Sequence, residues 1–440
     1  MNSEELVRKN KEFTLASWKA QATWNPITTV RAEGVYFYGA NGEKYLDWAS
    51  QLINVNIGHG NEKVIKAIQD QVAKLCYVAP SVATEPRARL GELLNEVTPT
   101  GLSKSFFTTA GTDAVENAIK IARLYTGRRK IVTRYRSYHG ATAGSMTAGG
   151  DPRRLANEPG IEGIVRIHGA DPLRSPIYKG RTAEEGDAII ADLLEQTINF
   201  EGPQYVAAIL LEGYSGTSGI YQPGATFWNR VQEICEKYNI LLIIDEVMSG
   251  FGRTGKWFGI DHYPNVKPDM MCLAKGINSG YIPLGAVVVS DKIADHFENN
   301  VLWAGLTYSS HALACAAGVA TIEYMKETNL VEKAAEMGKF LRRELDKLNE
   351  KHKSVAEIRG EGMHQIIDLG YENGEPLSPF NAPPTEPMQK VAKVLTDNNL
   401  ITFVKWNTIY CCPPLIITEE QILEAIAILD KALDVADKFV

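Results

Sequence analysis

The apolar positions in the middle of the chain form short continuous runs, separated by longer stretches in which apolar and polar residues alternate. The runs are KSFFTT (104–109), YVAAILLE (205–212), LLIID (241–245), MMCLA (270–274) and AVVVS (286–290). Runs of this length predict buried strands, and we expect them to form one parallel set. The pattern therefore predicts an α/β fold with a mostly parallel sheet and helices on both faces.

The stretches between the strands have helical spacing. After the first strand, apolar residues recur at i, i+3, i+4 and i+7, at Val115, Ala118, Ile119 and Ala122. The stretch before 241–245 places Phe227, Val231, Ile234, Cys235 and Tyr238 on one face. From about residue 311 the chain is predicted to be mainly helical, with charged helices near 328–352 and 419–437 and a turn-rich segment at 370–387.

A chain of 440 residues is longer than one ordinary domain. We predict a large α/β domain over 55–320 that binds the cofactor. A smaller α+β domain is predicted over 321–440, joined by the N-terminal segment 1–54.

Composition narrows the function. The formal net charge is −7 and no basic stripe is visible, so we expect neither nucleic acid nor an acidic membrane as a partner. The N-terminus is charged and no apolar run is long enough to span a membrane. The six cysteines form no C-x-x-C pair, which favours reduced thiols in a cytoplasmic protein and no metal site.

Two of the predicted strands lead into residues that carry chemistry. One ends at Asp245, and another runs into Lys275. Either residue alone could be an ordinary polar residue at a strand end. Ligands of parallel sheets bind at this edge, however, and one chemistry requires both residues. A desolvated lysine amine forms an imine with an aldehyde, while a buried carboxylate keeps a pyridine nitrogen protonated. The pair therefore predicts a pyridoxal-phosphate enzyme with Lys275 and Asp245 as catalytic residues.

The junction Ala110-Gly111-Thr112 between a strand and a helix is a candidate phosphate site. Backbone N–H groups at the start of a helix attract anions, and the glycine allows a close approach. A plain turn with Thr112 as the N-cap is the alternative.

GFGRTGKWFG (250–259) resembles two nucleotide motifs without fulfilling either. Gly250, Gly252 and Gly255 match the dinucleotide fingerprint, but the aromatic, turn-like stretch that follows does not predict the required helix. A P-loop requires Ser or Thr where Trp257 stands. A dinucleotide-dependent oxidoreductase is therefore disfavoured.

In this order, these residues resemble the class III (ω-) aminotransferases of the fold-type I pyridoxal-phosphate enzymes. The resemblance extends from 34–60 to 413–422 and is strongest in LLIIDEVMSGFGRTGKWF and PDMMCLAKG. It implies that Lys275 carries the cofactor as a Schiff base and that Asp245 pairs with the pyridinium nitrogen. It implies further cofactor contacts for Gly111, Thr112, Tyr138, His139, Glu212, Val247 and Met248.

The resemblance also assigns individual roles. Gly111 and Thr112 would bind the phosphate, and Tyr138 and Val247 would lie on opposite faces of the cofactor ring. Thr307 matches a threonine that reaches the phosphate of the neighbouring subunit. The resemblance therefore implies a homodimer with shared active sites.

The chain departs from the family pattern at informative positions. Met248 replaces a frequent glutamine that touches the ring oxygen, and Ala141 stands where γ-aminobutyrate enzymes carry arginine. Many members use a glutamate–arginine switch to accept two kinds of substrate. Thr217 stands here at the glutamate position and Tyr410 at the arginine position, so both residues of the switch are absent. Glu212 is retained, although Gly213 replaces the proline that follows it in the family.

An anionic substrate still requires a cation. Arg153 and Arg154 are the candidates because guanidinium groups suit carboxylate and sulfonate oxygens, although the two could form a solvated surface pair. Trp18 is a candidate for the substrate entrance. The segments SQLINVNIGHG, LCYVAPSVATEPRA, RYRSYHGATAG and GDPRR resemble the taurine-type members most.

The expected function is therefore transfer of an amino group from a small ω-amino acid or amine to a keto acid in a ping-pong cycle. Taurine is favoured as the donor, with β-alanine next, and 2-oxoglutarate is favoured as the acceptor. The alternatives are pyruvate as the acceptor, or a decarboxylase or aminomutase of the same fold.

Overall fold

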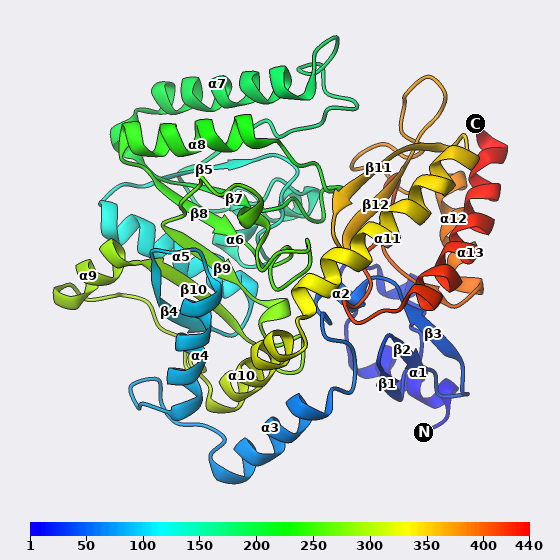
Figure 1. The fold of residues 1–440 in the computed structure, drawn as a ribbon, viewed down its shortest axis with the longest axis horizontal. Coiled ribbons are helices and arrows are strands. Elements are labelled where there is room, and N and C mark those ends of the chain that lie inside the picture. The colour runs from blue at the N-terminus through cyan, green and yellow to red at the C-terminus, as the bar shows by residue number, and fades with distance from the viewer.

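The computed structural model describes all 440 residues and contains three sheets (Figure 1). The largest has seven strands in the order β4-β10-β9-β8-β7-β5-β6. They are β4 (Leu102–Thr108), β5 (Lys130–Arg134), β6 (Ile164–Ile167), β7 (Val206–Glu212), β8 (Leu241–Asp245), β9 (Met270–Leu273) and β10 (Gly285–Ser290). The strands from β9 to β6 are parallel to their neighbours, which confirms the mostly parallel sheet.

One strand corrects the prediction. β10, the AVVVS run, is antiparallel to both β9 and β4 and does not join the parallel set. The physical reason is the connection: the residues between Leu273 and Gly285 contain one short 3₁₀ turn, Lys275–Ile277, and no α-helix. A parallel return requires a crossover of a dozen or more residues, usually an α-helix.

Helices cover both faces of the large sheet, as predicted. In β8, Leu241 and Ile243 pack into one apolar cluster while Leu242 and Ile244 pack into another, because successive side chains point to opposite faces. Residues of α5 (Gly111–Thr126) and α9 (Asp291–Asn299) belong to the first cluster. Residues of α7 (Ala183–Glu201) and α8 (Ala225–Tyr238) belong to the second.

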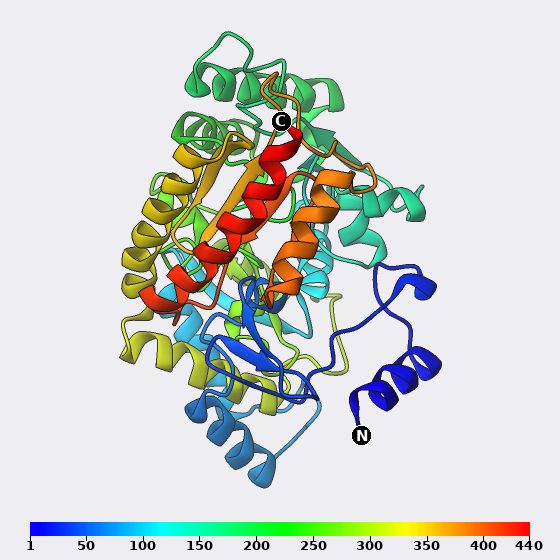
Figure 2. The same ribbon diagram turned by 90° about the vertical axis from the view of Figure 1, so that its right-hand side faces the viewer.

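The remaining strands form two smaller sheets (Figure 2). One contains β1 (Arg31–Glu33), β2 (Tyr36–Tyr38), β3 (Lys44–Asp47) and β13 (Leu400–Ile401). The other contains β11 (Val355–Glu361), β12 (His364–Leu369), β15 (Thr408–Cys411) and β14 (Val404–Lys405). N-terminal strands thus share a sheet with a strand near the C-terminus, while the boundaries at 54/55 and 320/321 stay a prediction.

The helices outside the large sheet's two layers complete the fold. They are α1 (Ser3–Phe13), α2 (Ser50–Ile53), α3 (Glu62–Lys74), α4 (Glu85–Val97), α6 (Ala143–Ala148), α10 (Ala312–Glu327), α11 (Leu330–Lys351), α12 (Glu386–Asp397) and α13 (Glu419–Ala436). Figure 1 shows α11, α12 and α13 together on the side of the molecule that carries the C-terminus. None of the helices combines the length and the apolar character that crossing a membrane would require.

Candidate active site

The ends of three neighbouring strands bring together a group of charged residues, which we call the strand-end group: Glu212, Asp245 and Lys275. Glu212 and Asp245 are register partners on β7 and β8, and Asp245 is opposite Cys272 on β9. Lys275 follows β9 with a left-handed backbone, φ 48°. This conformation is uncommon for a residue with a long side chain, and strained residues of this kind cluster at functional sites.

The electrostatics of Lys275 favour a reactive amine. Desolvation by the surrounding protein lowers the pKa of Lys275 to about 8, although the charges of Asp245 and Glu212 raise it. Arg153 and Arg253 act in the same direction as desolvation. An amine with this pKa carries an appreciable neutral fraction near neutral pH, and the neutral form is the nucleophile.

Asp245 is buried and held by two hydrogen bonds. Its Oδ2 lies 2.7 Å from Nδ1 of His139, and its Oδ1 accepts from the Val247 N–H at 3.0 Å. The His139 ring is buried too, and its Nε2 has no hydrogen-bond partner. His139 therefore orients the Asp245 carboxylate, a contact that the sequence motif alone did not reveal.

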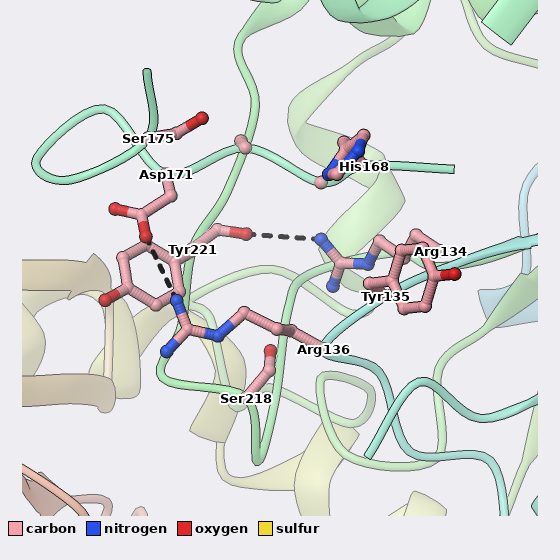
Figure 3. Close-up of a pocket in the computed structure, with 10 residues that line it drawn as sticks. Arg134, Tyr135, Arg136, His168, Asp171, Ser175, Ser218 and Tyr221 are labelled. Atoms are coloured by element: carbon pink, nitrogen blue, oxygen red, sulfur yellow. Dashed lines mark hydrogen bonds and ion pairs between the residues drawn. The ribbon is translucent and has the colours of Figure 1, made fainter. Parts of the chain in front are cut away.

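Glu212 is buried beside an arginine that sequence reasoning missed. Arg134, at the end of β5, forms an ion pair with the Glu212 carboxylate, and both side chains are at least nine-tenths buried. Arg134 also lines a polar cavity of about 150 Å³, together with Arg136, His168, Asp171 and Tyr221 (Figure 3). The ion pair with Arg134 therefore holds the Glu212 carboxylate in place at the edge of the sheet.

The turn between β4 and α5 has the features of an anion site. No side chain caps α5, so the turn itself supplies no acceptor for the first N–H groups of the helix. The Thr112 hydroxyl is engaged with Thr142 and Ser145 at 2.8 and 2.7 Å. It does not act as the N-cap, and the backbone N–H groups of Gly111 and Thr112 are what this turn presents.

Tyr138 and Arg153 form one edge of the site. The Arg153 guanidinium carbon lies 3.8 Å from the centre of the Tyr138 ring and 5.4 Å from that of Trp18. Asp151 holds the guanidinium through two hydrogen bonds, at 2.7 and 3.2 Å. The structure thus brings Arg153 and Trp18, both predicted substrate residues, next to the predicted cofactor-stacking tyrosine.

Lys405 completes this edge from a distant part of the chain. Its Nζ donates to Asp151 Oδ2 at 2.9 Å, across 254 residues of sequence. We call Asp151, Arg153 and Lys405 the Asp151 cluster. Sequence reasoning missed Asp151 and Lys405, because no local pattern marks a pair so far apart in sequence.

The structure separates Arg154 and Thr307 from this centre, whereas Val247 and Met248 lie next to it. The Arg154 side chain forms an ion pair with Glu158, and this is its only side-chain hydrogen bond. Thr307 is exposed, and its carbonyl accepts from the Tyr77 hydroxyl at 2.8 Å.

The Val247 side chain lies against Gly111, where an added Cβ would come within 2.8 Å of it. Met248, the next residue, is half-buried.

Comparison with known proteins places the whole chain. Residues 18–433 match the profile of the family described as Aminotransferase class-III. The chain belongs to the class III aminotransferases.

Two relatives illustrate the range of the family. A taurine–pyruvate aminotransferase of Bilophila wadsworthia is 33% identical over 99% of this chain and 98% of its own length. A putrescine–pyruvate aminotransferase of Pseudomonas aeruginosa is 34% identical over 92% of this chain and 90% of its own.

A solved structure agrees in fold along its whole length. The taurine:2-oxoglutarate aminotransferase from Bifidobacterium kashiwanohense, in complex with PLP and glutamate, superposes with a TM-score of 0.95 at 39% identity. The match covers 100% of this chain and 99% of that one. This aminotransferase therefore has the fold-type I architecture and depends on pyridoxal phosphate.

The residues present fit that cofactor. Lys275 supplies an amine whose pKa is lowered to about 8, which suits an aldehyde. Asp245 supplies a buried carboxylate oriented by His139, which suits a protonated ring nitrogen. The uncapped start of α5 suits a phosphate.

In this aminotransferase the GFGRTG segment serves the fold. Arg253 is fully buried and donates to the carbonyls of Met363 and Pro413, at 3.1 and 2.6 Å, and to Ser50 and Asn56, at 3.0 and 2.8 Å. It links the N-terminal segment, the large sheet's loops and the C-terminal part. No α-helix follows the glycines, as the sequence predicted; a short 3₁₀ helix, Gly259–His262, comes before β9.

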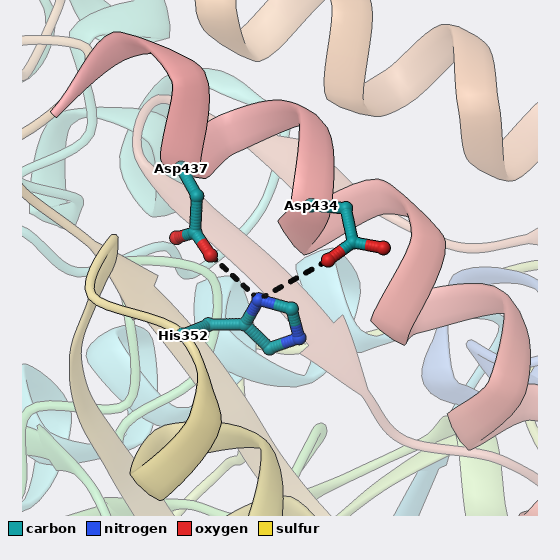
Figure 4. A group of neighbouring side chains, drawn as sticks. All are labelled: His352, Asp434 and Asp437. Atoms are coloured by element: carbon teal, nitrogen blue, oxygen red, sulfur yellow. Dashed lines mark hydrogen bonds and ion pairs between the residues drawn. The ribbon is translucent and has the colours of Figure 1, made fainter.

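A second polar group lies near the C-terminus (Figure 4). Here His352 is close to aspartates in α13 and directly after it. Its two ring nitrogens lie 2.8 Å from Asp430 and 2.8 Å from Asp437. Because each nitrogen already has a carboxylate partner, this group acts as a link between the end of α11 and α13.

Proposed function

We propose that this aminotransferase takes the amino group from a small ω-amino acid with an anionic end, taurine first and β-alanine second. The acceptor is 2-oxoglutarate. The observation that carries the donor assignment is the Arg153 guanidinium, stacked 3.8 Å from Tyr138 and held by Asp151. A planar guanidinium offers paired donors to a sulfonate or carboxylate.

The relatives support this choice. The solved structure that matches at 39% identity is named for taurine and 2-oxoglutarate, and the Bilophila relative is named for taurine. Arginine is absent at Ala141 and Tyr410, where other members bind carboxylates, so the guanidinium of Arg153, beside Tyr138, is our candidate for the substrate anion.

We assign the cofactor contacts as follows. Lys275 holds the aldehyde carbon, Asp245 with His139 faces the ring nitrogen, and the N–H groups of Gly111 and Thr112 hold the phosphate. Tyr138 and Val247 enclose the ring, and Glu212 and Met248 lie beside it. When bound, pyridoxal phosphate supplies an electron sink for the bonds at the amine-bearing carbon.

The protein's own residues move the proton. Lys275 would serve as the base that takes a proton from the substrate carbon and returns it, because desolvation lowers the pKa of its amine to about 8. His139 and the Val247 N–H hydrogen-bond to the two carboxylate oxygens of Asp245 and hold the carboxylate in place. The donor product leaves before the keto acid enters, which gives ping-pong kinetics.

The active enzyme is a homodimer in which Thr307 contributes to the partner subunit's phosphate site. Large apolar side chains around Thr307 are exposed in the single chain: Val301 at 63%, Trp303 at 75% and Tyr308 at 59%. Exposed apolar side chains gathered in one segment are typical of a subunit interface. Thr307 lies within this segment, next to Tyr308.

A panel of donors and acceptors tests the proposal. Taurine, β-alanine, γ-aminobutyrate and putrescine are each offered with 2-oxoglutarate and with pyruvate, and kcat/KM is measured for every pair. Taurine with 2-oxoglutarate should give the highest value. Putrescine, which has no anionic end, should rank last; a first rank for putrescine would refute the anionic donor.

Pyruvate as the acceptor is the second candidate. The relatives from Bilophila and Pseudomonas are both named for pyruvate, at 33% and 34% identity. The same panel decides between the acceptors, since each donor is measured with both.

A further inference from the structure

We propose that Lys405 recognises the distal carboxylate of a dicarboxylic keto acid, so that the Asp151 cluster distinguishes 2-oxoglutarate from pyruvate. The inference rests on the proposed function, because it concerns the residue that binds 2-oxoglutarate, the proposed acceptor. Arg153 and Lys405 would serve different anions that occupy the same site in turn.

The geometry places two cations on one carboxylate. Asp151 Oδ2 accepts from Lys405 Nζ at 2.9 Å and from Arg153 at 3.2 Å, while Oδ1 accepts from the Arg153 Nε at 2.7 Å. Two positive charges facing one negative charge leave a net charge of +1. That charge matches one further anionic group from a substrate.

The exposure of the three side chains supports this arrangement. The Asp151 side chain is 7% exposed, whereas those of Arg153 and Lys405 are 30% and 29% exposed. The Asp151 carboxylate is therefore buried below the surface, while the charged groups of Arg153 and Lys405 remain accessible. The Lys405 ammonium has three donors; it uses two, on Asp151 and on the Thr217 carbonyl at 3.1 Å.

The environment of Lys405 also points to the active site. Desolvation lowers the pKa of Lys405, and the charges acting on it include those of Asp151, Arg153 and Glu212. Glu212 belongs to the strand-end group. Lys405 also contacts Thr217, whose hydroxyl is buried and has no hydrogen-bond partner, so one polar group beside Lys405 is unpaired.

The backbone holds Lys405 in a strained hairpin. Lys405 ends β14, and Trp406 in the turn to β15 has φ 53°, which few residues with side chains adopt. The ammonium lies 4.2 Å from the centre of the Trp406 ring. Such strain is typical of functional positions, where it fixes a group in place.

Substrate dimensions assign a different anion to each cation. In taurine one methylene separates the amine-bearing carbon from the sulfonate. In 2-oxoglutarate two methylenes separate the keto carbon from the distal carboxylate, which therefore extends further from the reacting carbon. Arg153 stacks on Tyr138, whereas Lys405 comes from the β14–β15 hairpin and shares the Oδ2 of Asp151 with Arg153, so we assign the distal carboxylate of the longer substrate to Lys405. Pyruvate has no distal carboxylate.

Binding of two unreactive acids to the holoenzyme tests the inference without turnover. Glutarate has a carboxylate at each end, and pentanoate has the same length but only one. Both dissociation constants are measured by calorimetry for the wild type, Lys405→Met, Lys405→Arg and the control Lys179→Met. Lys179 is exposed and forms no ion pair. KM and kcat for 2-oxoglutarate and for pyruvate are measured on the same proteins.

We expect Lys405→Met to weaken glutarate binding by tenfold or more, on the order expected for a charge-assisted contact. The KM for 2-oxoglutarate should rise by a similar factor, while pentanoate binding and the KM for pyruvate stay unchanged. Lys405→Arg should retain most of the glutarate affinity, and Lys179→Met all of it. If Lys405→Met fails to fold, Lys405→Gln provides the same comparison.

Two results would overturn the inference: equal losses for glutarate and pentanoate, or no loss for either. Failure of taurine as a donor would refute the proposed donor only, because neither glutarate nor pentanoate binding requires an amine. A wild type that binds glutarate no better than pentanoate would also refute the role of Lys405.

Discussion

The strand-end group and the Asp151 cluster are neighbours that are built in different ways. Glu212 and Asp245 are placed by the register of adjacent parallel strands, and Lys275 follows the next strand. The Asp151 cluster joins the loop before Pro152–Asn157 to a hairpin 254 residues away through ion pairs. The strand-end carboxylates are deeply buried, whereas Arg153 and Lys405 keep almost a third of their side chains exposed.

This difference teaches how the enzyme divides its work. A rigid sheet edge fixes groups whose relative positions the chemistry requires. In our proposal the groups that bind the substrate anion come from a 3₁₀ helix and a hairpin outside the large sheet, and such segments can change between relatives without disturbing the sheet. Substitutions in the strand-end group should therefore abolish catalysis, whereas substitutions in the Asp151 cluster should change preference.

The largest effect is expected for Lys275→Ala, because the cofactor linkage and the proton-transferring base are lost together. We expect kcat to fall by at least about ten-thousandfold with every donor. The visible absorption of the bound cofactor, roughly 400–430 nm, should disappear as well. Retention of more than about one hundredth of the rate would contradict the role of Lys275.

A mixing experiment controls for misfolding of this variant. Thr307→Ala subunits are exchanged with Lys275→Ala subunits, and activity is followed during exchange. Some dimers then carry one site with both an intact Lys275 and the partner's intact Thr307, so activity should reappear. No recovery despite demonstrated exchange would argue against a shared active site.

Substitution of Arg153 should have a smaller effect on kcat/KM, and the effect should be selective for the anionic donor. Arg153→Ala should lower kcat/KM for taurine by about tenfold to a hundredfold, since a charge-assisted contact is lost. The value for propylamine, which has no anion, should hardly change. Arg154→Ala is the matched control, because Arg154 pairs with Glu158 outside the cluster. If Arg153→Ala lowered kcat/KM equally for taurine and propylamine, Arg153 would have no role in recognising the substrate anion.

What could be predicted from the sequence follows the same division. Lys275, Asp245 and the Gly111-Thr112 turn were identifiable because each terminates or follows an apolar run with its own local signal. The direction of β10 was mispredicted, since an apolar run does not reveal whether its connection is long enough for a crossover. Lys405 carried no signal, because its partner Asp151 is close only in the folded chain.

The two arginines show the limit within a single motif. Arg153 and Arg154 are adjacent in sequence and chemically identical, so composition gave no reason to prefer either. The Asp151 side chain selects Arg153 by holding its guanidinium over Tyr138. Arg154 pairs with Glu158 instead. The choice depends on side-chain partners, which a pattern of residue types does not contain.

The smallest effect concerns pH and separates Lys275 from an ordinary lysine. Because burial lowers the pKa of Lys275 to about 8, its amine is mostly protonated below pH 8 and mostly neutral above it. The apoenzyme should therefore combine with pyridoxal phosphate about fivefold faster at pH 8 than at pH 7, and the rate should level off above about pH 9. The rate is followed by the rise in visible absorption, with Lys275→Ala as the blank. A solvated lysine titrates near pH 10.4, so for such a residue the rate would keep rising about tenfold per unit through pH 9. A rate that still climbs between pH 9 and pH 10 would show that the surroundings of Lys275 do not activate it, and that the burial of the strand-end group has another role.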